Sequence, residues 1–270
     1  MKKDKKLISL SNELRKKILN MIYLRKSSHL GSNLSVVEIL IAIYSLINTT
    51  KIIKNKIDRD RVFISKGHCA AAVYSVLEIF NILKKGSTLK FLDNKNDLAA
   101  HVCHSVKGVE HSTGALGHGL PCAVGAALGL RSRNLKSKVF VICGDGELQE
   151  GSIWESLMLA SHHKLSNLEI FIDYNKISSI TLTNKVLNIE PLAEKFKSFG
   201  FNVFQVDGHN LNSLTKLIKK NKRLNKPKVY ICHTIKGKGV SFCENKPIWH
   251  YKTLDKKLFE QAIKVYSESN

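Results

Sequence analysis

The sequence predicts a doubly wound α/β fold, a mostly parallel sheet with helices on both faces. From Val139 onward, short runs rich in β-branched and aromatic residues alternate with helical patterns, as in chains that build parallel sheets. The run 139–142, Val-Phe-Val-Ile, is apolar at every position, which is typical of a strand buried on both faces. Together these two observations favour a sheet that is covered on each side by helices.

The expected elements follow in chain order. Each strand is a β-branched or aromatic run bounded by turn residues, and the five strands are 61–65, 138–143, 168–174, 201–206 and 228–233. Helical patterns fill the other stretches, and the expected helices are 11–25, 35–47, 69–83, 116–131, 153–163, 191–199, 211–222 and a last one at 254–267. The segments 86–108 and 177–189 are expected to be long loops, which in compact domains are often functional. Because we find no internal repeat and no low-complexity linker, residues 1–270 are expected to form a single domain.

The chain is strongly basic, with 43 Lys and Arg against 22 Asp and Glu and a formal net charge of +21. Such a charge suits nucleic acid. Only seven of the basic residues are arginine, however, the side chain on which base recognition most depends, and the lysines are spread over the whole chain. We therefore expect no nucleic-acid partner, and attraction for phosphorylated, anionic substrates is the interpretation that remains.

Composition and apolar runs exclude several other classes. Hydrophobic residues make up 43% of the 270 residues and charged residues 24%, which is typical of globular proteins and not of disordered, collagen-like or coiled-coil chains. No apolar run approaches the ~20 residues of a membrane span, and the basic start is not followed by the apolar core of a signal peptide. We expect no membrane contact and a cytoplasmic location. The six cysteines form no CxxC pair and are expected to be reduced, mostly structural thiols.

A candidate site follows the strand expected at 138–143. Gly144, Asp145 and Gly146 come directly after it, where the carboxyl end of the strand would face a ligand. Asn175 follows the strand 168–174 in the same way. Oxygen ligands from two strand ends suit a hard cation such as Mg²⁺, and the glycines let a diphosphate approach the backbone amides. Since Gly-Asp-Gly alone is also the composition of an ordinary tight turn, the interpretation depends on the two strand ends together.

Five blocks in a fixed order give the chain a resemblance to a known family. They are Ser28-His29-Leu30-Gly31-Ser32, then Ser65-Lys66-Gly67-His68 with His101, then 112–119, then Gly-Asp-Gly with Asn175, and last 236–239 with Trp249 and His250. Over nearly its whole length the chain resembles the N-terminal half of transketolase, and it is similar to the N-terminal subunit of a split transketolase. The resemblance implies the thiamine diphosphate-binding fold, with thiamine diphosphate and Mg²⁺ as cofactors.

The resemblance also implies which residues contact the cofactor. These are His68, Gly114, Leu116, Gly144, Asp145, Gly146, Asn175, Ile177 and His250. Asp145, Asn175 and the backbone carbonyl of Ile177 correspond to the Mg²⁺ ligands. The stretch with Gly114 and Leu116 corresponds to the one beneath the two rings of the cofactor, and the remaining residues correspond to those around its diphosphate.

A second implied set is catalytic, and it consists of His29, His68, His101, Glu150 and His250. Cleaving a ketose between C2 and C3 needs an electron sink, which the cofactor supplies. Histidines titrate near neutrality, so a group of them can move protons on and off sugar hydroxyls. His29 and His101 correspond to residues that contact these hydroxyls, and Glu150 to a carboxylate of the proton network between subunits. Taken alone, each histidine is more often an ordinary surface or core residue, and only the block around it favours the functional interpretation.

Alternatives remain open at this point. The α subunit of a 2-oxo acid dehydrogenase shares the cofactor, but a 2-oxo acid has no sugar hydroxyls for the histidines to contact. A non-catalytic basic protein would be expected to have lost cofactor positions, which are present here. The group His101, Cys103, His104 and His111 could bind zinc, although its spacing matches no common zinc motif.

Some positions depart from the family pattern. His118 stands where many transketolases have glutamine, and Cys103 and His104 also differ from the usual residues. These departures put the sugar specificity in doubt and make a specialised ketol transferase of unusual-sugar metabolism a further alternative. They leave the expected cofactor unchanged.

The chain lacks room for the second half of a transketolase. That half would carry the pyrimidine-binding domain, the glutamate that activates the cofactor and most residues that bind the substrate phosphate. We therefore expect a partner, the C-terminal transketolase subunit, in an α₂β₂ heterotetramer that acts on sugar phosphates, and negligible activity of this chain alone.

Overall fold

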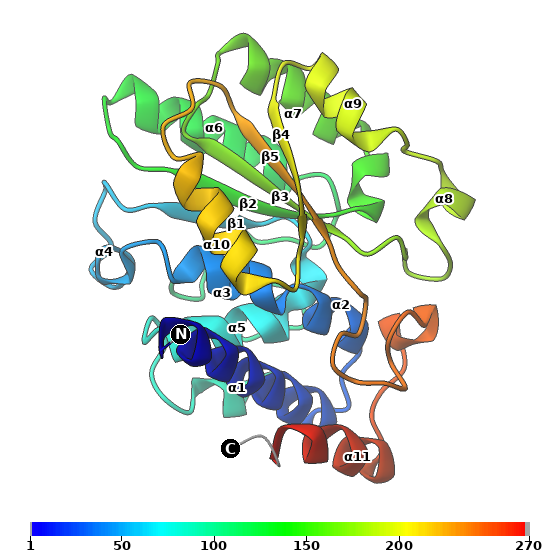
Figure 1. Ribbon diagram of the computed structural model, residues 1–270. Coiled ribbons are helices and arrows are strands. Elements are labelled where there is room, and N and C mark those ends of the chain that lie inside the picture. Colours follow the sequence, from blue (N-terminus) through cyan, green and yellow to red (C-terminus); the bar gives the residue numbers. More distant parts are fainter. Residues whose placement is uncertain (1, 268–270) are drawn as a thin grey trace.

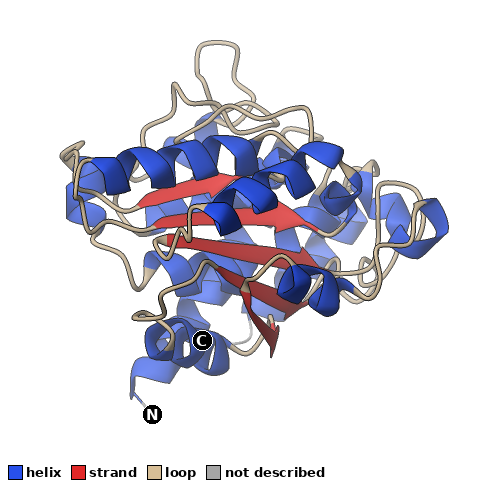
Figure 2. Cartoon of the chain, turned by 90° about the horizontal axis from the view of Figure 1, so that it is seen from above, coloured by secondary structure: helices blue, strands red, loops and turns tan. Residues whose placement is uncertain are grey.

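The computed structural model describes residues 2–267, and in them the expected sheet is present. Its five strands are all parallel and lie in the order β1-β2-β3-β5-β4. They are β1 (Arg61–Ile64), β2 (Val139–Gly144), β3 (Leu168–Tyr174), β4 (Asn202–Asp207) and β5 (Lys228–His233). Figure 2 shows the strands pointing the same way between two layers of helices. The predicted doubly wound α/β fold is confirmed, and the described sheet is wholly rather than mostly parallel.

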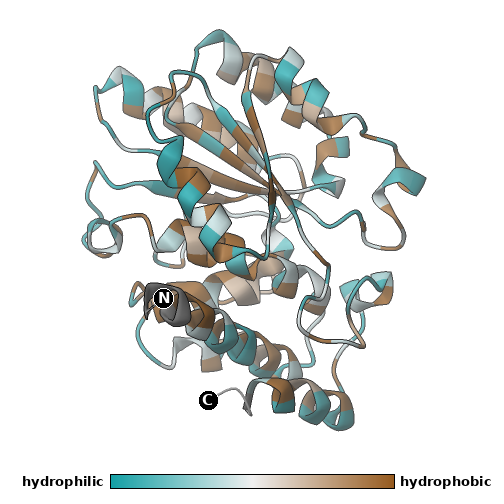
Figure 3. Ribbon diagram, in the orientation of Figure 1, coloured by the Kyte–Doolittle hydropathy of each residue, from teal (hydrophilic) through white to brown (hydrophobic). Residues whose placement is uncertain are grey.

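Alternate residues of the central strands enter two separate cores, because successive side chains of a strand point to opposite faces. Phe140 and Ile142 of β2 belong to one core, and Val141 and Cys143 to the other. The first core is covered by α1 (Lys2–Leu24), α3 (Val37–Tyr44), α5 (Ala70–Ile79) and α10 (Leu211–Lys220). The second is covered by α6 (Gly119–Ser132), α7 (Gly151–His162) and α9 (Leu192–Ser198). The strands are accordingly hydrophobic along most of their length in Figure 3.

Several helix boundaries differ from the prediction. The helix predicted at 35–47 corresponds to α3, which is shorter at both ends, and the preceding α2 (Leu30–Ser35), separated from α3 by a break at Val36, was not predicted. Every residue of both helices is buried, so the apolar pattern has no helical period that could locate the break. Helix α1 begins nine residues before the predicted start, in the lysine-rich stretch, and the helix predicted at 69–83 ends at Ile79.

Short helical turns also occur where none was predicted. The two expected loops contain the 3₁₀ turn Ser87–Lys90 and the short helix α8 (Thr183–Val186), and α4 (Thr49–Ile53) precedes β1. The last helix, α11 (Lys256–Ser267), lies beside α1 (Figure 1). The rings of Phe259 and Tyr23 stack between the two helices, with their centroids 4.2 Å apart. None of the helices in residues 2–267 has both the length and the apolar character that a membrane span requires.

Candidate functional site

A cavity of about 370 Å³ opens at the carboxyl edge of the sheet. The segments that follow β1, β2, β3 and β5 line it, together with loops from both helical layers. Every residue that the sequence marked as a cofactor or catalytic residue is on its wall: His29, His68, His101, Gly114, Leu116, Gly144, Asp145, Gly146, Glu150, Asn175, Ile177 and His250. The structure thus brings the whole predicted set together, while the role of each residue stays a prediction.

The three predicted metal ligands lie in two turns that are tied to each other. The Asp145 carboxylate accepts hydrogen bonds from the amide of Gly146 (2.8 Å) and from the amide of Lys176, which lies between the other two ligands in the sequence. The amide oxygen of Asn175 accepts from the amide of Ile177 at 3.1 Å. Burial, followed by the nearby Asp173 carboxylate, raises the pKa of Asp145 to about 6. A cation beside Asp145 would stabilise its charged form.

A buried ion pair closes the floor of the cavity behind these ligands. The Lys66 ammonium binds the Asp173 carboxylate, and the two side chains are 1% and 0% exposed. Asp173 also accepts hydrogen bonds from the hydroxyls of Ser35 (2.6 Å) and Thr234. Burial alone would raise the pKa of Asp173, but the Lys66 charge holds it below its ordinary value. The sequence analysis missed Asp173, whose signal is a lone acidic residue at the end of an otherwise apolar strand.

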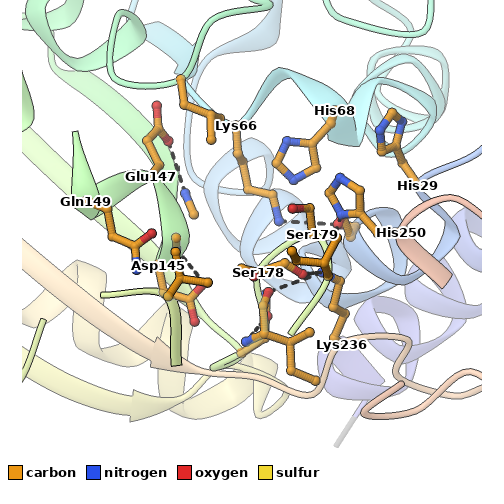
Figure 4. Close-up of a pocket in the computed structure, with 18 of the residues that line it drawn as sticks. His29, Lys66, His68, Asp145, Glu147, Gln149, Ser178, Ser179, Lys236 and His250 are labelled. Carbon is orange, nitrogen blue, oxygen red and sulfur yellow. Dashed lines mark hydrogen bonds between the residues drawn. The ribbon is translucent and has the colours of Figure 1, made fainter. Parts of the chain in front are cut away.

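Lys236 is the first residue of the sequence block 236–239, but the sequence alone assigns it no role. Its ammonium donates to the carbonyls of Ile177 (3.2 Å) and Ser178 (2.6 Å) and lies 3.4 Å from Nδ1 of His250 (Figure 4). Burial, and then the charge of Lys66, lower the pKa of Lys236 to about 8. Two carbonyl oxygens in this cavity are thus already arranged around a positive charge.

Glu147 shapes the wall on the other side. Its carboxylate accepts hydrogen bonds from the hydroxyl of Ser65 and from the amides of Gly117 (2.8 Å) and Gly144 (3.2 Å). Gly117 has a φ of +81°, and a Cβ there would lie 2.7 Å from that of Glu150, so only glycine fits. By accepting from both Gly117 and Gly144, the Glu147 carboxylate holds the loop with Gly114 and Leu116 against the end of β2. Glu147 was also missed, because it follows Gly-Asp-Gly as an ordinary acidic residue.

Four histidines gather on one side of the cavity. The ring centroid of His29 lies 5.7 Å from that of His68, 5.4 Å from that of His101 and 4.8 Å from that of His250. Figure 4 shows three of these imidazoles grouped opposite Asp145. They come from four segments that are far apart in the sequence, and none of them is on a strand.

These imidazoles are neutral at pH 7. Burial, and then His101, lower the pKa of His29 to about 4, and burial, and then Lys236, lower that of His250 to about 3. Burial and the charge of Lys66 hold the pKa of His68 well below its ordinary value, and burial lowers that of His101. Titration near neutrality, expected from the sequence, is therefore wrong for the cavity as described, in which these side chains are available as proton acceptors.

The backbone around these histidines is held in an unusual conformation. His29 has a φ of +66°, in the left-handed region, and its amide donates to the carbonyl of His250 at 2.9 Å. The Asn33 amide group donates to the carbonyls of His29 (2.9 Å) and His68 (3.3 Å), and its oxygen accepts from the amide of Ala72 (2.8 Å). Asn33 therefore connects two of the four segments, which the sequence did not reveal.

The positions that depart from the family pattern lie outside the cavity wall. His118, Cys103 and His104 are absent from the lining, and His118 is exposed at the start of α6. The Ser112 hydroxyl bonds the Nδ1 atom of His104 at 2.7 Å and donates to the Cys103 sulfur at 3.6 Å. Within the described part of the chain no group of three or more His, Cys, Asp or Glu side chains is arranged to hold a metal ion.

With this geometry established, comparison with known proteins identifies the family. Residues 6–266 match the family model described as "Transketolase, thiamine diphosphate binding domain". The chain belongs to the transketolase family. It corresponds to the thiamine diphosphate-binding part, as its resemblance implied.

Two relatives that match over most of their length are named as transketolase subunits. This member of the family is 34% identical over 260 residues to an apulose-4-phosphate transketolase subunit of Phocaeicola vulgatus, and the match covers 96% of this chain and 92% of the relative. It is 35% identical over 260 residues to a 6-deoxy-6-sulfo-D-fructose transketolase subunit of a Clostridium species, with 94% and 93% covered. The identification as the N-terminal subunit of a split transketolase is thereby confirmed.

Solved transketolases share the fold. The transketolase of Campylobacter jejuni superposes with a TM-score of 0.89 at 28% identity, covering 97% of this chain and 42% of that one. The Pichia stipitis transketolase in complex with sedoheptulose 7-phosphate gives 0.86 at 27% identity, with 98% and 40% covered. The chain thus spans about two fifths of the length of these transketolases.

Proposed function

We propose that this chain is the cofactor-binding subunit of a two-component transketolase, which moves a two-carbon ketol unit from a ketose phosphate to an aldose acceptor. The observation that carries this proposal is a cavity in which oxygen ligands, glycine loops and four histidines from distant segments face one another. A single domain over residues 1–270 is part of the same proposal.

The residues present fit a Mg²⁺-bound diphosphate. Asp145, Asn175 and the carbonyl of Ile177 offer three oxygen ligands within two connected turns, and Mg²⁺ prefers oxygen ligands together with phosphate oxygens. Lys236 and the neutral His68 and His250 offer N–H donors beside them. Thiamine diphosphate, when bound, supplies the electron sink that cleavage of a ketose needs. Gly114 and Leu116 would lie beneath its rings.

The histidines would bind the hydroxyl groups of the sugar and exchange protons with them. At pH 7 each neutral imidazole has one N–H that can donate to a hydroxyl and one lone pair that can accept a proton. We propose this role for His29 and His101, whose ring centroids lie 5.4 Å apart, while His250, whose Nδ1 is 3.4 Å from the Lys236 ammonium, would lie nearer the diphosphate. Anionic phosphate groups nearby would raise the pKa values of these histidines. We propose that Glu150, an exposed residue of the cavity lining, would contact the partner chain.

A partner chain is supported by the relatives that match over most of their length, because they are named as subunits. We propose that the partner is the C-terminal transketolase subunit, in an α₂β₂ assembly. The relatives are named after different sugars, apulose 4-phosphate and 6-deoxy-6-sulfo-D-fructose. A specialised sugar is therefore a second candidate substrate. The histidine group favours a sugar substrate, whether an ordinary ketose phosphate or a specialised sugar, over a 2-oxo acid.

The test is to co-purify the chain with the product of the neighbouring gene and to titrate thiamine diphosphate with Mg²⁺ by calorimetry. Turnover of xylulose 5-phosphate, apulose 4-phosphate and 6-deoxy-6-sulfofructose is then compared. Binding in the pair together with turnover supports the proposal. Binding without turnover of any of the three would refute the substrate class, and absence of binding would refute the cofactor.

A further inference from the structure

Lys236 reaches the cavity on a segment whose position depends on one side chain outside it. The chain leaves the sheet at the end of β5 and runs through 234–237 (Figure 1). The amide of Thr234 donates to the carbonyl of Tyr174 (3.1 Å), and that of Gly237 to the carbonyl of Gly31 (3.0 Å). The amide of Ile235, directly before Lys236, instead donates to Nε2 of His209 at 2.8 Å.

His209 is held between this amide and a buried carboxylate. Its Nδ1 lies 2.9 Å from Oε2 of Glu38 on α3, which also forms a bidentate ion pair with Arg15 at 2.7 and 3.0 Å. Arg15 and Glu38 are each 5% exposed. Since the Ile235 amide is a donor, Nε2 must be the unprotonated nitrogen, and Nδ1 carries the proton that it donates to Glu38. The partners of both ring nitrogens thus fix the imidazole in one tautomer and one orientation.

The turn that carries His209 is built against the same segment. It connects β4 to α10, and the amide of Gly208 donates to the carbonyl of His233 at 2.8 Å. A Cβ at Gly208 would lie 2.4 Å from the side-chain methyl of Thr234, so the close approach of the two segments requires glycine. The amide of His209 donates to the Asp207 carboxylate at 2.9 Å, which sets the direction of the turn.

We propose that His209 is a positioning residue for the cofactor site: by accepting the hydrogen bond of the Ile235 amide, it fixes where the Lys236 ammonium lies. His209 itself is not part of the cavity wall. Arg15 supports the same segment farther along, because its Nε donates to the carbonyl of Lys238 at 3.2 Å. The inference rests on the proposed function in one respect, namely that Lys236 serves the bound diphosphate.

Two variants separate the two hydrogen bonds of the ring. In His209→Gln the side-chain oxygen takes the place of Nε2 and keeps the acceptor for Ile235, while the donor to Glu38 is lost. In His209→Asn the side-chain nitrogen takes the place of Nδ1 and keeps the donor to Glu38, while the acceptor is lost. Both are made in the full chain and studied alone by hydrogen–deuterium exchange of segment 234–238, and with the partner subunit by titration of thiamine diphosphate with Mg²⁺.

For His209→Asn we expect faster exchange in 234–238 and binding of thiamine diphosphate that is about fivefold to tenfold weaker, the size of one lost hydrogen bond. For His209→Gln we expect both properties to stay within about twofold of the wild type, even if its melting midpoint falls. Equal weakening of both variants, or weakening that only follows the melting midpoint, would assign His209 a merely structural role and overturn the inference. If the wild-type pair binds no thiamine diphosphate, the proposed function fails, and the inference falls with it.

Discussion

The buried pair of Lys66 and Asp173 gives a prediction that does not depend on the cofactor. In Asp173→Asn the side chain keeps its shape, but the Lys66 ammonium loses its opposite charge and keeps only neutral acceptors, such as the carbonyl of Ser32 at 3.3 Å. Removing one partner of a buried pair costs about 3–5 kcal/mol of unfolding free energy, since the remaining charge is buried without compensation. An unfolding entropy of about 2.1 cal/mol/K per residue gives about 0.57 kcal/mol/K for the whole chain, so the melting midpoint is expected to fall by about 5–9 °C.

A double-mutant cycle shows whether this cost comes from the charge. Combining Asp173→Asn with Lys66→Met removes both charges, and the double variant is expected to be more stable than Asp173→Asn alone. Glu194→Gln is the matched control, because the pair of Glu194 and Lys197 is 63% and 57% exposed and is worth only about 0–0.5 kcal/mol. The measurement is calorimetric melting at pH 7 of the wild type, the single variants Asp173→Asn and Lys66→Met, the double variant and the control. Additive losses in the double variant, or a shift in the control as large as that of Asp173→Asn, would refute the reasoning.

Three further predictions concern the cavity. Asp145→Ala should weaken binding of thiamine diphosphate by the pair at least about tenfold, or about 1.4 kcal/mol, and a chelator of Mg²⁺ should weaken wild-type binding but add little in the variant; calorimetry with and without the chelator decides this. The pKa values of His29 and His250 are lowered from 6.5 to about 4 and about 3, so the folded chain binds fewer protons than the unfolded one in this range. Their contribution to stability is present above pH ~6.5 and is lost as the pH falls toward 4, and the double variant His29→Asn with His250→Asn should flatten the dependence of the melting midpoint on pH; an unchanged slope would contradict the assignment. Asn33→Asp keeps the acceptor for the Ala72 amide but places a carboxylate against the carbonyls of His29 and His68. Turnover by the two-subunit pair should therefore fall by about tenfold or more, as measured by steady-state kinetics, and cofactor affinity by less, as measured by calorimetry. Equal losses of turnover and affinity would contradict this prediction.

The sheet could be predicted from the sequence because its central strands are buried on both faces. All five strands were located to within one residue at each end, and β3 and β5 were located without error. The position of the candidate site at the carboxyl edge of the sheet could be predicted from the same pattern, since Asp145 and Asn175 come directly after such strands. Helix ends were less predictable where a whole segment is buried, as at Val36, because burial on every side removes the period that a helix leaves in the sequence.

Buried charges could not be predicted from composition. With 43 basic residues in the chain, Lys66 and Lys236 look like ordinary surface lysines, yet they are 1% and 2% exposed. What places them inside is a carboxylate or a set of carbonyls from distant parts of the chain: Asp173 for Lys66, and Ile177 and Ser178 for Lys236. Such a pairing exists only after the sheet has brought the strand ends together.

The two kinds of residue in the cavity are held in different ways, which bears on how they respond to substitution. Asp145 and Asn175 extend from neighbouring strands whose register is fixed by the sheet, where Gly144 pairs with Asp173. The histidines depend on contacts between loops, such as the bond from the amide of His29 to the carbonyl of His250 and the two that Asn33 donates. A loop held by a few hydrogen bonds shifts at lower cost than a strand end within a sheet. Changes around Asn33 should therefore impair the proposed proton transfer by the histidines at smaller structural cost than they weaken binding of the cofactor.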